Sequence, residues 1–168
     1  MDPFDLLGVE PRFDIDPAIV EQRHRDLSRA LHPDRFVGRP ASERRLALTR
    51  AIEMNDAWRR IRDPVSRSEA LLARYGIDAS ESSGARASPQ LLMDMMEQRE
   101  ELAETRASRN KERLSVLTTA MRDREKNVLV SLQNAFSQDP HSAPPLLAEL
   151  RFVRRYLEES SDAENDIQ

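Results

Sequence analysis

The stretch ALHPDRF, residues 30–36, contains a histidine and an aspartate that could do chemistry, with a proline between them. A histidine and an aspartate two positions apart can act as an acid–base pair or supply ligands to a metal ion. A proline between them instead fits a rigid turn that ends a helix, because proline lacks a backbone N–H and fixes its φ angle. Such a turn can also be a surface that another protein binds. The tripeptide alone leaves these three interpretations open for His32, Pro33 and Asp34.

The rest of the sequence argues against catalysis or metal binding at these positions. The other histidines, His24 and His141, have no ligand-like spacing to His32, and the chain has no cysteine. Neither a nucleophile motif nor a glycine-rich phosphate loop accompanies His32 and Asp34. We therefore expect a protein that is not an enzyme, has no catalytic residues, and needs no metal or cofactor.

Composition and charge favour an all-helical protein. Charged residues make up 33% of the 168 residues, aromatic residues make up 5%, and Gly occurs 4 times, which disfavours a turn-rich β-sandwich. Residues 1–76 hold 14 Arg, no Lys and 13 acidic residues, a net charge of 14 − 13 = +1. The remaining residues hold 26 − 14 = 12 basic and 30 − 13 = 17 acidic residues, a net charge of −5. Neither half is basic enough to predict binding to nucleic acid.

The amino-terminal sequence MDPFDLLGVE has no basic region followed by an apolar region, so it does not resemble a signal peptide. No apolar run approaches the length that crosses a bilayer. We expect a cytoplasmic protein with no membrane partner.

Helix start and stop signals divide residues 1–76 into four helices. The first begins near Pro3, and the second begins at Asp16-Pro17 and ends before Pro33. A third helix runs from about Ser42 to Arg62, and Asp63-Pro64 opens a fourth that ends at Gly76. Apolar residues at spacings of three and four predict the core positions Val20, Leu27, Leu31, Ala47, Ala51, Met54, Trp58 and Ile61, with Phe36 and Val37 as anchors of the loop.

The second half reads as a separate helical unit. Residues 77–88 contain few bulky side chains and predict a linker. Residues 89–158 predict a three-helix bundle, with a break near RASRNKE (106–112) and a second break at SQDPHSAPP (137–145). The acidic residues 159–168 are expected to be a disordered tail.

The first unit resembles a J domain. The resemblance rests on a short opening helix, His-Pro-Asp between two helices, the block from Asn55 to Trp58, and Asp63-Pro64 followed by Arg67. It implies that His32, Pro33 and Asp34 contact a DnaK-type ATPase chaperone and stimulate its ATP hydrolysis. The basic residues Arg25, Arg29 and Arg35 would add electrostatic steering towards an acidic surface of that chaperone.

The stretch LLMDMMEQREELAE, residues 91–104, opens the second unit with a distinctive pattern. Leu92 and Met96 are four residues apart, and Glu97, Glu100, Glu101 and Glu104 form an acidic stripe at helical spacing. The apolar pair could be core with the glutamates as a solvated face. A methionine-rich patch beside clustered acids also suits an adaptable protein-binding surface.

Together the two units resemble the HscB family, the J-domain co-chaperones of iron–sulfur cluster assembly. The shared features are the J domain, HPDRF, the 91–104 helix and LRFVRRYL near the carboxyl end, residues 150–157. The resemblance implies an all-α, L-shaped molecule that serves the chaperone HscA. It also implies a site for the scaffold IscU at Leu92, Met93, Met96, Glu97, Glu100, Glu104 and Phe152.

Three features depart from the family pattern. Asp26 stands where J domains generally carry a basic residue, and Arg35 replaces the usual lysine, keeping its charge but not its hydration. The cysteine-containing amino-terminal extension of eukaryotic relatives is missing, which suggests a bacterial protein. Two alternatives stay open: a J-domain adaptor for an unrelated client, and a helical scaffold protein with a coincidental His-Pro-Asp. The sequence also allows self-association.

Overall fold

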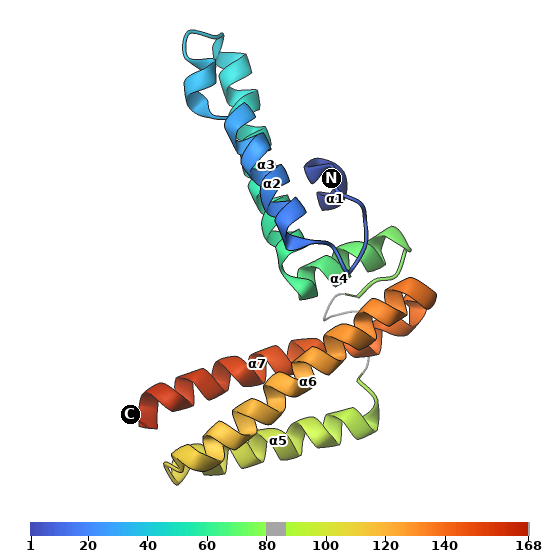
Figure 1. The fold of residues 1–168 in the computed structure, drawn as a ribbon, viewed down its shortest axis with the longest axis vertical. Coiled ribbons are helices and arrows are strands. Elements are labelled where there is room, and N and C mark those ends of the chain that lie inside the picture. Colours follow the sequence, from blue (N-terminus) through green and yellow to red (C-terminus); the bar gives the residue numbers. More distant parts are fainter. Residues whose placement is uncertain (80–86, 168) are drawn as a thin grey trace. The chain divides into compact units, whose positions relative to one another are not determined.

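The computed structural model describes residues 1–79 and 87–167, and regular structure in these residues is entirely helical. The chain divides into two compact units, residues 1–77 and 78–168, which are described separately below (Figure 1). This confirms the all-α class that the composition predicts.

The amino-terminal unit contains α1 (Pro3–Leu7), α2 (Pro17–Ala30), the 3-10 helix η1 (Pro33–Phe36), α3 (Ala41–Arg62) and α4 (Pro64–Arg74). Three of its α-helices begin with an aspartate cap followed by proline. The side chains of Asp2, Asp16 and Asp63 accept hydrogen bonds from backbone N–H groups in the first turn of α1, α2 and α4. The cap satisfies a donor that the helix leaves open, and proline removes another.

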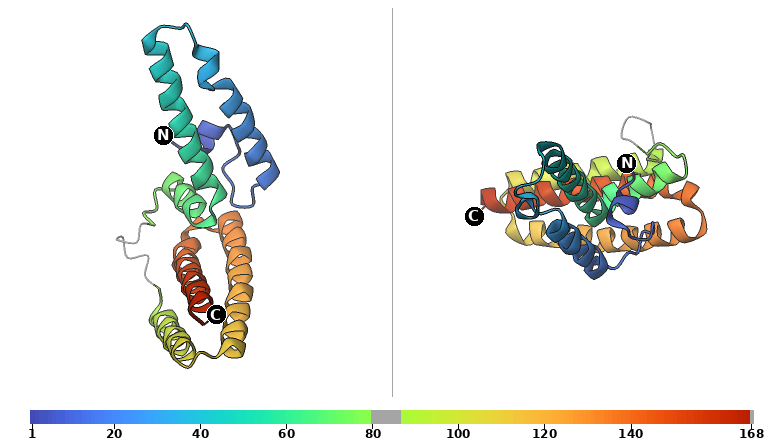
Figure 2. Two further views of the ribbon diagram at one scale, coloured as in Figure 1. Left: turned by 90° about the vertical axis from the view of Figure 1, so that its left-hand side faces the viewer. Right: turned by 90° about the horizontal axis from the view of Figure 1, so that it is seen from above.

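Helices α2 and α3 form a long antiparallel pair, and α1 packs against the part of this pair near α4 (Figure 2). The core lies there and includes Phe4, Leu7, Val20, Met54, Ile61, Leu71 and Leu72, while Ala47 is buried nearer the loop. Near the loop the pair has no third helix over it, so Leu27, Leu31 and Phe36 are only half-buried. The expectation that Val37 anchors the core is wrong, because its side chain is 79% exposed.

The carboxyl-terminal unit contains α5 (Pro89–Ala107), α6 (Lys111–Gln138), the 3-10 helix η3 (Pro140–Ser142) and α7 (Ala143–Ile167). The predicted break between α5 and α6 is confirmed. Arg109 there adopts a left-handed backbone with φ of 53°, and the side chain of Asn110 caps α6 by accepting from Arg113 N. Helices α6 and α7 pack along their length, burying Leu117, Val128, Leu132, Leu147, Leu150 and Val153.

The expected disordered tail at 159–168 is corrected by the structure, because α7 continues to Ile167. Ser160, Ala163 and Ile167 are buried, and they extend the inward-facing stripe of α7 at helical spacing. Ala163 and Ile167 join a core cluster with Leu102 and Leu114. Asp162 and Glu164 between them are exposed, so a charged segment can still be a packed helix. The predicted linker at 77–88 falls mostly on residues 80–86, which lie outside the described residues.

Candidate functional site

His32, Pro33 and Asp34 form the start of η1, at the end of the α2–α3 pair. Nδ1 of His32 accepts a hydrogen bond from the backbone N–H of Asp34 at 3.3 Å, so His32 caps the 3-10 helix. That bond requires an imidazole with an unprotonated Nδ1. A protonated ring would instead form an ion pair with Oδ2 of Asp34, which lies 3.5 Å from Nδ1. The side chains of His32 and Asp34 are 58% and 86% exposed, so both are accessible to a binding partner.

Consecutive backbone turns hold the loop that carries the tripeptide. The N–H of Arg35 donates to His32 O at 3.0 Å, and the N–H of Arg39 donates to Phe36 O at 3.1 Å. Gly38 within the second turn has φ of 80°, a conformation that a side chain would strain. Pro33 fixes a further dihedral. The loop therefore loses little conformational entropy when a partner binds.

Arg25, Arg29 and Arg35, the other residues predicted to bind the chaperone, are exposed on α2 and η1. Arg25 Nη2 donates to Gln22 Oε1 at 2.8 Å, and Gln22 Nε2 donates to the Asp26 carboxylate at 2.9 Å. Gln22 therefore holds one cation and one anion next to each other on α2. The structure brings all six predicted residues to α2 and the adjoining loop, with Asp26 as a local negative charge among them.

A contact that sequence reasoning missed joins α2 to α3 between this loop and the core. His24 stacks on Trp58 with ring centroids 4.4 Å apart, and its Nε2 lies 2.9 Å from Asn55 Oδ1. Trp58 Nε1 donates to Glu21 Oε1 at 3.3 Å, and the Arg62 guanidinium lies 5.1 Å from the Trp58 ring centroid. The block from Asn55 to Trp58 was the available signal. The sequence of this block does not indicate which residue of α2 packs against Trp58.

The structure excludes the interpretation of the 91–104 stretch in which Leu92 and Met96 are core residues. Leu92, Met93 and Met96 are 51%, 59% and 64% exposed, so the apolar residues are not core. Leu102 and Thr105 are the buried residues of α5. Glu97, Glu100 and Glu104 are exposed beside the apolar patch, whereas Glu101 is half-buried and paired with Arg113 of α6. The stretch therefore presents apolar and acidic side chains to the outside.

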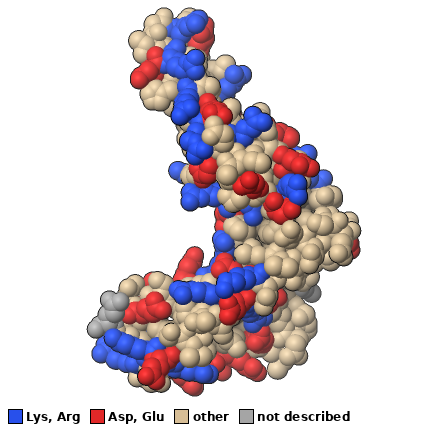
Figure 3. Space-filling model, viewed as in Figure 1, with Lys and Arg blue, Asp and Glu red and all other residues tan. Residues whose placement is uncertain are grey.

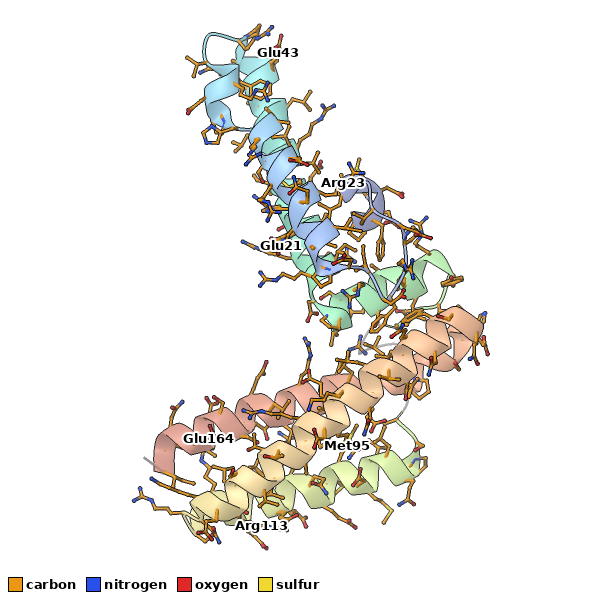
Figure 4. The ribbon with its side chains drawn as sticks, viewed as in Figure 1. Glu21, Arg23, Glu43, Met95, Arg113 and Glu164 are labelled. Carbon is orange, nitrogen blue, oxygen red and sulfur yellow. The ribbon has the colours of Figure 1, made fainter. Side chains whose placement is uncertain are left out.

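A groove of about 570 Å³ lies between α5 and α7. Leu92 and Met96 line one side and Phe152 lines the other, so the structure brings these predicted residues together. Met95 (Figure 4) and Tyr156 also line the groove, although sequence reasoning did not single them out. Met93, Glu97, Glu100 and Glu104 do not line it and lie on the adjoining face of α5. Three arginines, Arg99, Arg151 and Arg155, complete the groove wall.

Arginine–carboxylate pairs join α5 to the other two helices of the bundle. Arg124 of α6 donates to Asp94 of α5 at 2.6 Å and to Glu149 of α7 at 2.7 Å. Burial lowers the pKa of Arg124, but these two hydrogen bonds outweigh burial and leave that pKa raised. Arg99 with Glu159 and Arg106 with Asp166 form further pairs between α5 and α7. These contacts set the groove width because its two walls are on α5 and α7.

Tyr156 lies at the base of the groove and packs against Phe152, with ring centroids 6.1 Å apart. Burial raises the pKa of its hydroxyl to about 12, and the nearby Glu101 charge adds to the effect. Among residues 1–79 and 87–167 this hydroxyl has no hydrogen-bond partner. Tyr156 therefore acts here as a neutral, mostly apolar packing residue.

The described ranges contain no group of three His, Asp or Glu side chains arranged to hold a metal ion. Nor does any helix in the described part of the chain combine the length and apolarity needed to cross a membrane. The two surfaces above, one around the loop and one along α5 and α7, are thus the candidate functional sites.

Comparisons with known proteins agree with this arrangement. Residues 87–160 match the family model described as the HSCB C-terminal oligomerisation domain. A co-chaperone protein HscB homolog of Neisseria meningitidis serogroup C is 35% identical, over 95% of this chain and 97% of the relative. A homolog of the same description from Shewanella pealeana is 29% identical, over 98% of both chains.

Solved structures give the same result. The chaperone HscB from Vibrio cholerae matches with a TM-score of 0.87 and 28% identity, covering 100% of both chains. The human co-chaperone protein HscB matches with a TM-score of 0.89 and 26% identity, covering 98% of this chain and 82% of the human one. The predicted family and fold class are confirmed. The chain belongs to the HscB family of J-domain co-chaperones.

Proposed function

We propose that this protein stimulates the ATPase of an HscA chaperone, which is of the DnaK type, and delivers an IscU-type scaffold to it for iron–sulfur cluster maturation. The protein itself catalyses no reaction under this proposal; it changes the conformational equilibrium of its partner. The observation that carries the proposal is the exposed and conformationally fixed His32-Pro33-Asp34 turn in a chain that belongs to a co-chaperone family.

The chaperone-binding surface consists of His32, Pro33, Asp34, Arg25, Arg29 and Arg35. Asp34 offers a carboxylate that can accept charge-assisted hydrogen bonds from an arginine of the chaperone. The arginines of α2 and η1 increase the association rate with an acidic surface, because long-range attraction steers the encounter. Asp26 reduces that attraction locally, so this surface favours a specialised chaperone over a general one.

The scaffold-binding surface consists of Leu92, Met93, Met96, Glu97, Glu100, Glu104 and Phe152. Leu92, Met93 and Met96 are each 51–64% exposed, and burying this apolar area against a partner favours binding. Methionine side chains adapt their shape to the partner because their torsions are soft. The three glutamates beside them favour a partner with basic residues at the edge of its apolar contact.

Carrying both surfaces on one chain links the two binding events. A scaffold held by the carboxyl-terminal unit has a high effective concentration for a chaperone that is bound to the amino-terminal unit. The family model that matches residues 87–160 is named for oligomerisation, which supports self-association through the same unit.

The test is steady-state ATP hydrolysis by an HscA-type chaperone, with and without this protein and an IscU-type scaffold. Strong synergy when both are added supports the whole proposal. Stimulation by this protein without any effect of the scaffold would instead indicate a J-domain adaptor for another client. No stimulation under any condition would overturn the role of the turn.

A further inference from the structure

Charged residues of opposite sign lie on opposite sides of the apolar patch formed by Leu92, Met96 and Phe152. Glu97, Glu100 and Glu104 are exposed on α5. Arg151 and Arg155, four residues apart on α7, line the groove next to Phe152. Figure 3 shows bands of basic and acidic side chains close together on the visible face of this unit. The surface is therefore electrically asymmetric across the groove.

Helix geometry gives the order of these residues across the surface. Leu102 is buried and Met95 lines the groove, so their side of α5 faces α7. At about 100° per residue, and measured in the direction that passes Leu92 and Met96, Glu100 lies about 160° and Glu104 about 200° around the helix from Leu102. Leu92 and Met96 fall between these two directions. The order is therefore acidic edge, apolar patch, groove and basic edge.

The basic edge is partly fixed by the fold. Arg151 is half-buried, and its Nη2 donates to the carbonyl oxygen of Ala79 at 2.5 Å, which restrains the guanidinium beside the groove. Arg155 is exposed one turn further along α7. Arg99 adds a third cation to the groove wall and is positioned by its pair with Glu159.

We propose that this polarity fixes the orientation in which the partner protein binds. The partner it fits presents an apolar projection, with basic side chains on the side that meets α5 and acidic side chains on the side that meets Arg151 and Arg155. In the reverse orientation like charges would face each other, which opposes binding even though the apolar contact is the same. The proposal rests on the proposed function, because it describes the surface assigned there to the scaffold.

The test is a polarity-swapped variant of the full chain that carries Glu97→Arg, Glu100→Arg, Arg151→Glu and Arg155→Glu. Its net charge equals that of the unchanged protein, because two acids become bases and two bases become acids. Binding to an IscU-type scaffold is measured by titration calorimetry, and circular dichroism checks that the helices are retained. We expect binding at least about ten-fold weaker than that of the unchanged protein. Equal affinity would overturn the inference and leave the proposed function standing.

Two further proteins complete the experiment. Arg122→Glu reverses one exposed charge on α6, away from the groove wall, and is expected to change scaffold affinity less than Arg155→Glu does. Equal losses in these two variants would show an effect of net charge alone and overturn the inference. Should the polarity-swapped variant not fold, Arg155→Gln is measured instead, and unchanged affinity would count against the inference. No binding by the unchanged protein would overturn the proposed function as well.

Discussion

His24 of α2 and Trp58 of α3 stack with nearly parallel rings, 4.4 Å between centroids and 17° between planes. The stack lies where the α2–α3 pair leaves the core that α1 helps to form. Beyond it the apolar residues Leu27 and Leu31 are only half-buried. Toward the loop, Ser28 contacts the buried Met54, and Ala47 is buried as well, so the stack is one of several contacts that keep the two helices together on the approach to the His-Pro-Asp turn.

Replacing His24 by alanine tests the importance of this contact. We expect His24→Ala to lower the free energy of unfolding by about 1 kcal/mol, since an aromatic pair contributes about 0.5–1.5 kcal/mol beyond its burial. Denaturant unfolding followed through the fluorescence of Trp58, the single tryptophan, measures the change. Arg23→Ala is the control at an exposed neighbouring position. An equal effect of both changes would mean that the stack adds nothing specific.

Replacing His32 by glutamine separates the two proposed activities. We expect His32→Gln to abolish stimulation of the chaperone ATPase and to leave scaffold binding intact, because His32 lies in the other unit from α5. The His32 side chain is 58% exposed, so its replacement leaves the packed core unchanged. His141→Gln, the same substitution at an exposed position of η3, should leave stimulation unchanged. Persisting stimulation by His32→Gln would show that the loop is not the switch.

Charge reversal on α5 should have the opposite effect. With Glu97, Glu100 and Glu104 replaced by lysine, we expect scaffold affinity to fall by about ten-fold or more, because the basic edge of the partner then meets like charges. Stimulation of the ATPase without scaffold should survive. Calorimetry and the ATPase assay measure the two properties on the same preparation.

A matched control for this variant reverses three acidic residues elsewhere on the same unit. The positions are the exposed residues Glu112, Asp123 and Glu164. Scaffold affinity should stay close to that of the unchanged protein. A similar loss of scaffold affinity in both variants would contradict the assignment of the α5 glutamates to a specific contact.

Replacing Arg124 tests how strongly its ion pairs hold α5 against α6 and α7. We expect Arg124→Met to destabilise the unit by about 1.5–3 kcal/mol, because it leaves the partly buried carboxylates of Asp94 and Glu149 without their charged donor. Thermal unfolding by circular dichroism measures this loss. Lys126→Met removes an exposed cation two residues away and should change stability by less than 0.5 kcal/mol, about the limit for surface positions. Equal losses would rule out a special role for Arg124.

Tyr156→Phe removes a buried hydroxyl that has no partner among the described residues. Because that hydroxyl is desolvated without a compensating hydrogen bond, we expect the variant to be as stable as the unchanged protein or up to about 1 kcal/mol more stable. Because the pKa of Tyr156 is raised above its usual value of 10.0, folding favours the neutral phenol, and its contribution to the free energy of unfolding is fully present below pH 10. This contribution is lost as pH rises through about 12. A clear loss of stability at neutral pH would show that the hydroxyl is bonded.

Most helix boundaries could be predicted because they depend on residues that are neighbours in the sequence. Asp16-Pro17, Asp63-Pro64 and Ser88-Pro89 begin helices where the cap and proline rules place them. The packed carboxyl end of α7 could not be predicted from composition. Its acidic residues suggested disorder, whereas the spacing of Ser160, Ala163 and Ile167 decided the outcome.

The candidate site was predictable only in part. His-Pro-Asp by itself indicated a turn after a helix, and only its position between two helices of a unit resembling a J domain indicated a binding surface. The groove is lined by residues more than fifty positions apart in the sequence, such as Met95 and Phe152. Periodicity alone could not decide whether Leu92 and Met96 face inward, because α5 has apolar residues on more than one side.

More than three turns of α5 are partly or fully exposed at its amino end, which affects how well its backbone amides are protected from exchange. From Pro89 to Glu101, all within the described part of the chain, no residue is buried, whereas α6 and α7 bury side chains along their length. Amide hydrogens in that part of α5 should therefore exchange with solvent much sooner than those of α6 and α7, because opening it exposes little apolar surface. A partner that covers Leu92 and Met96 would slow this exchange, so the least protected helix of the unit would also be the one that reports binding most directly.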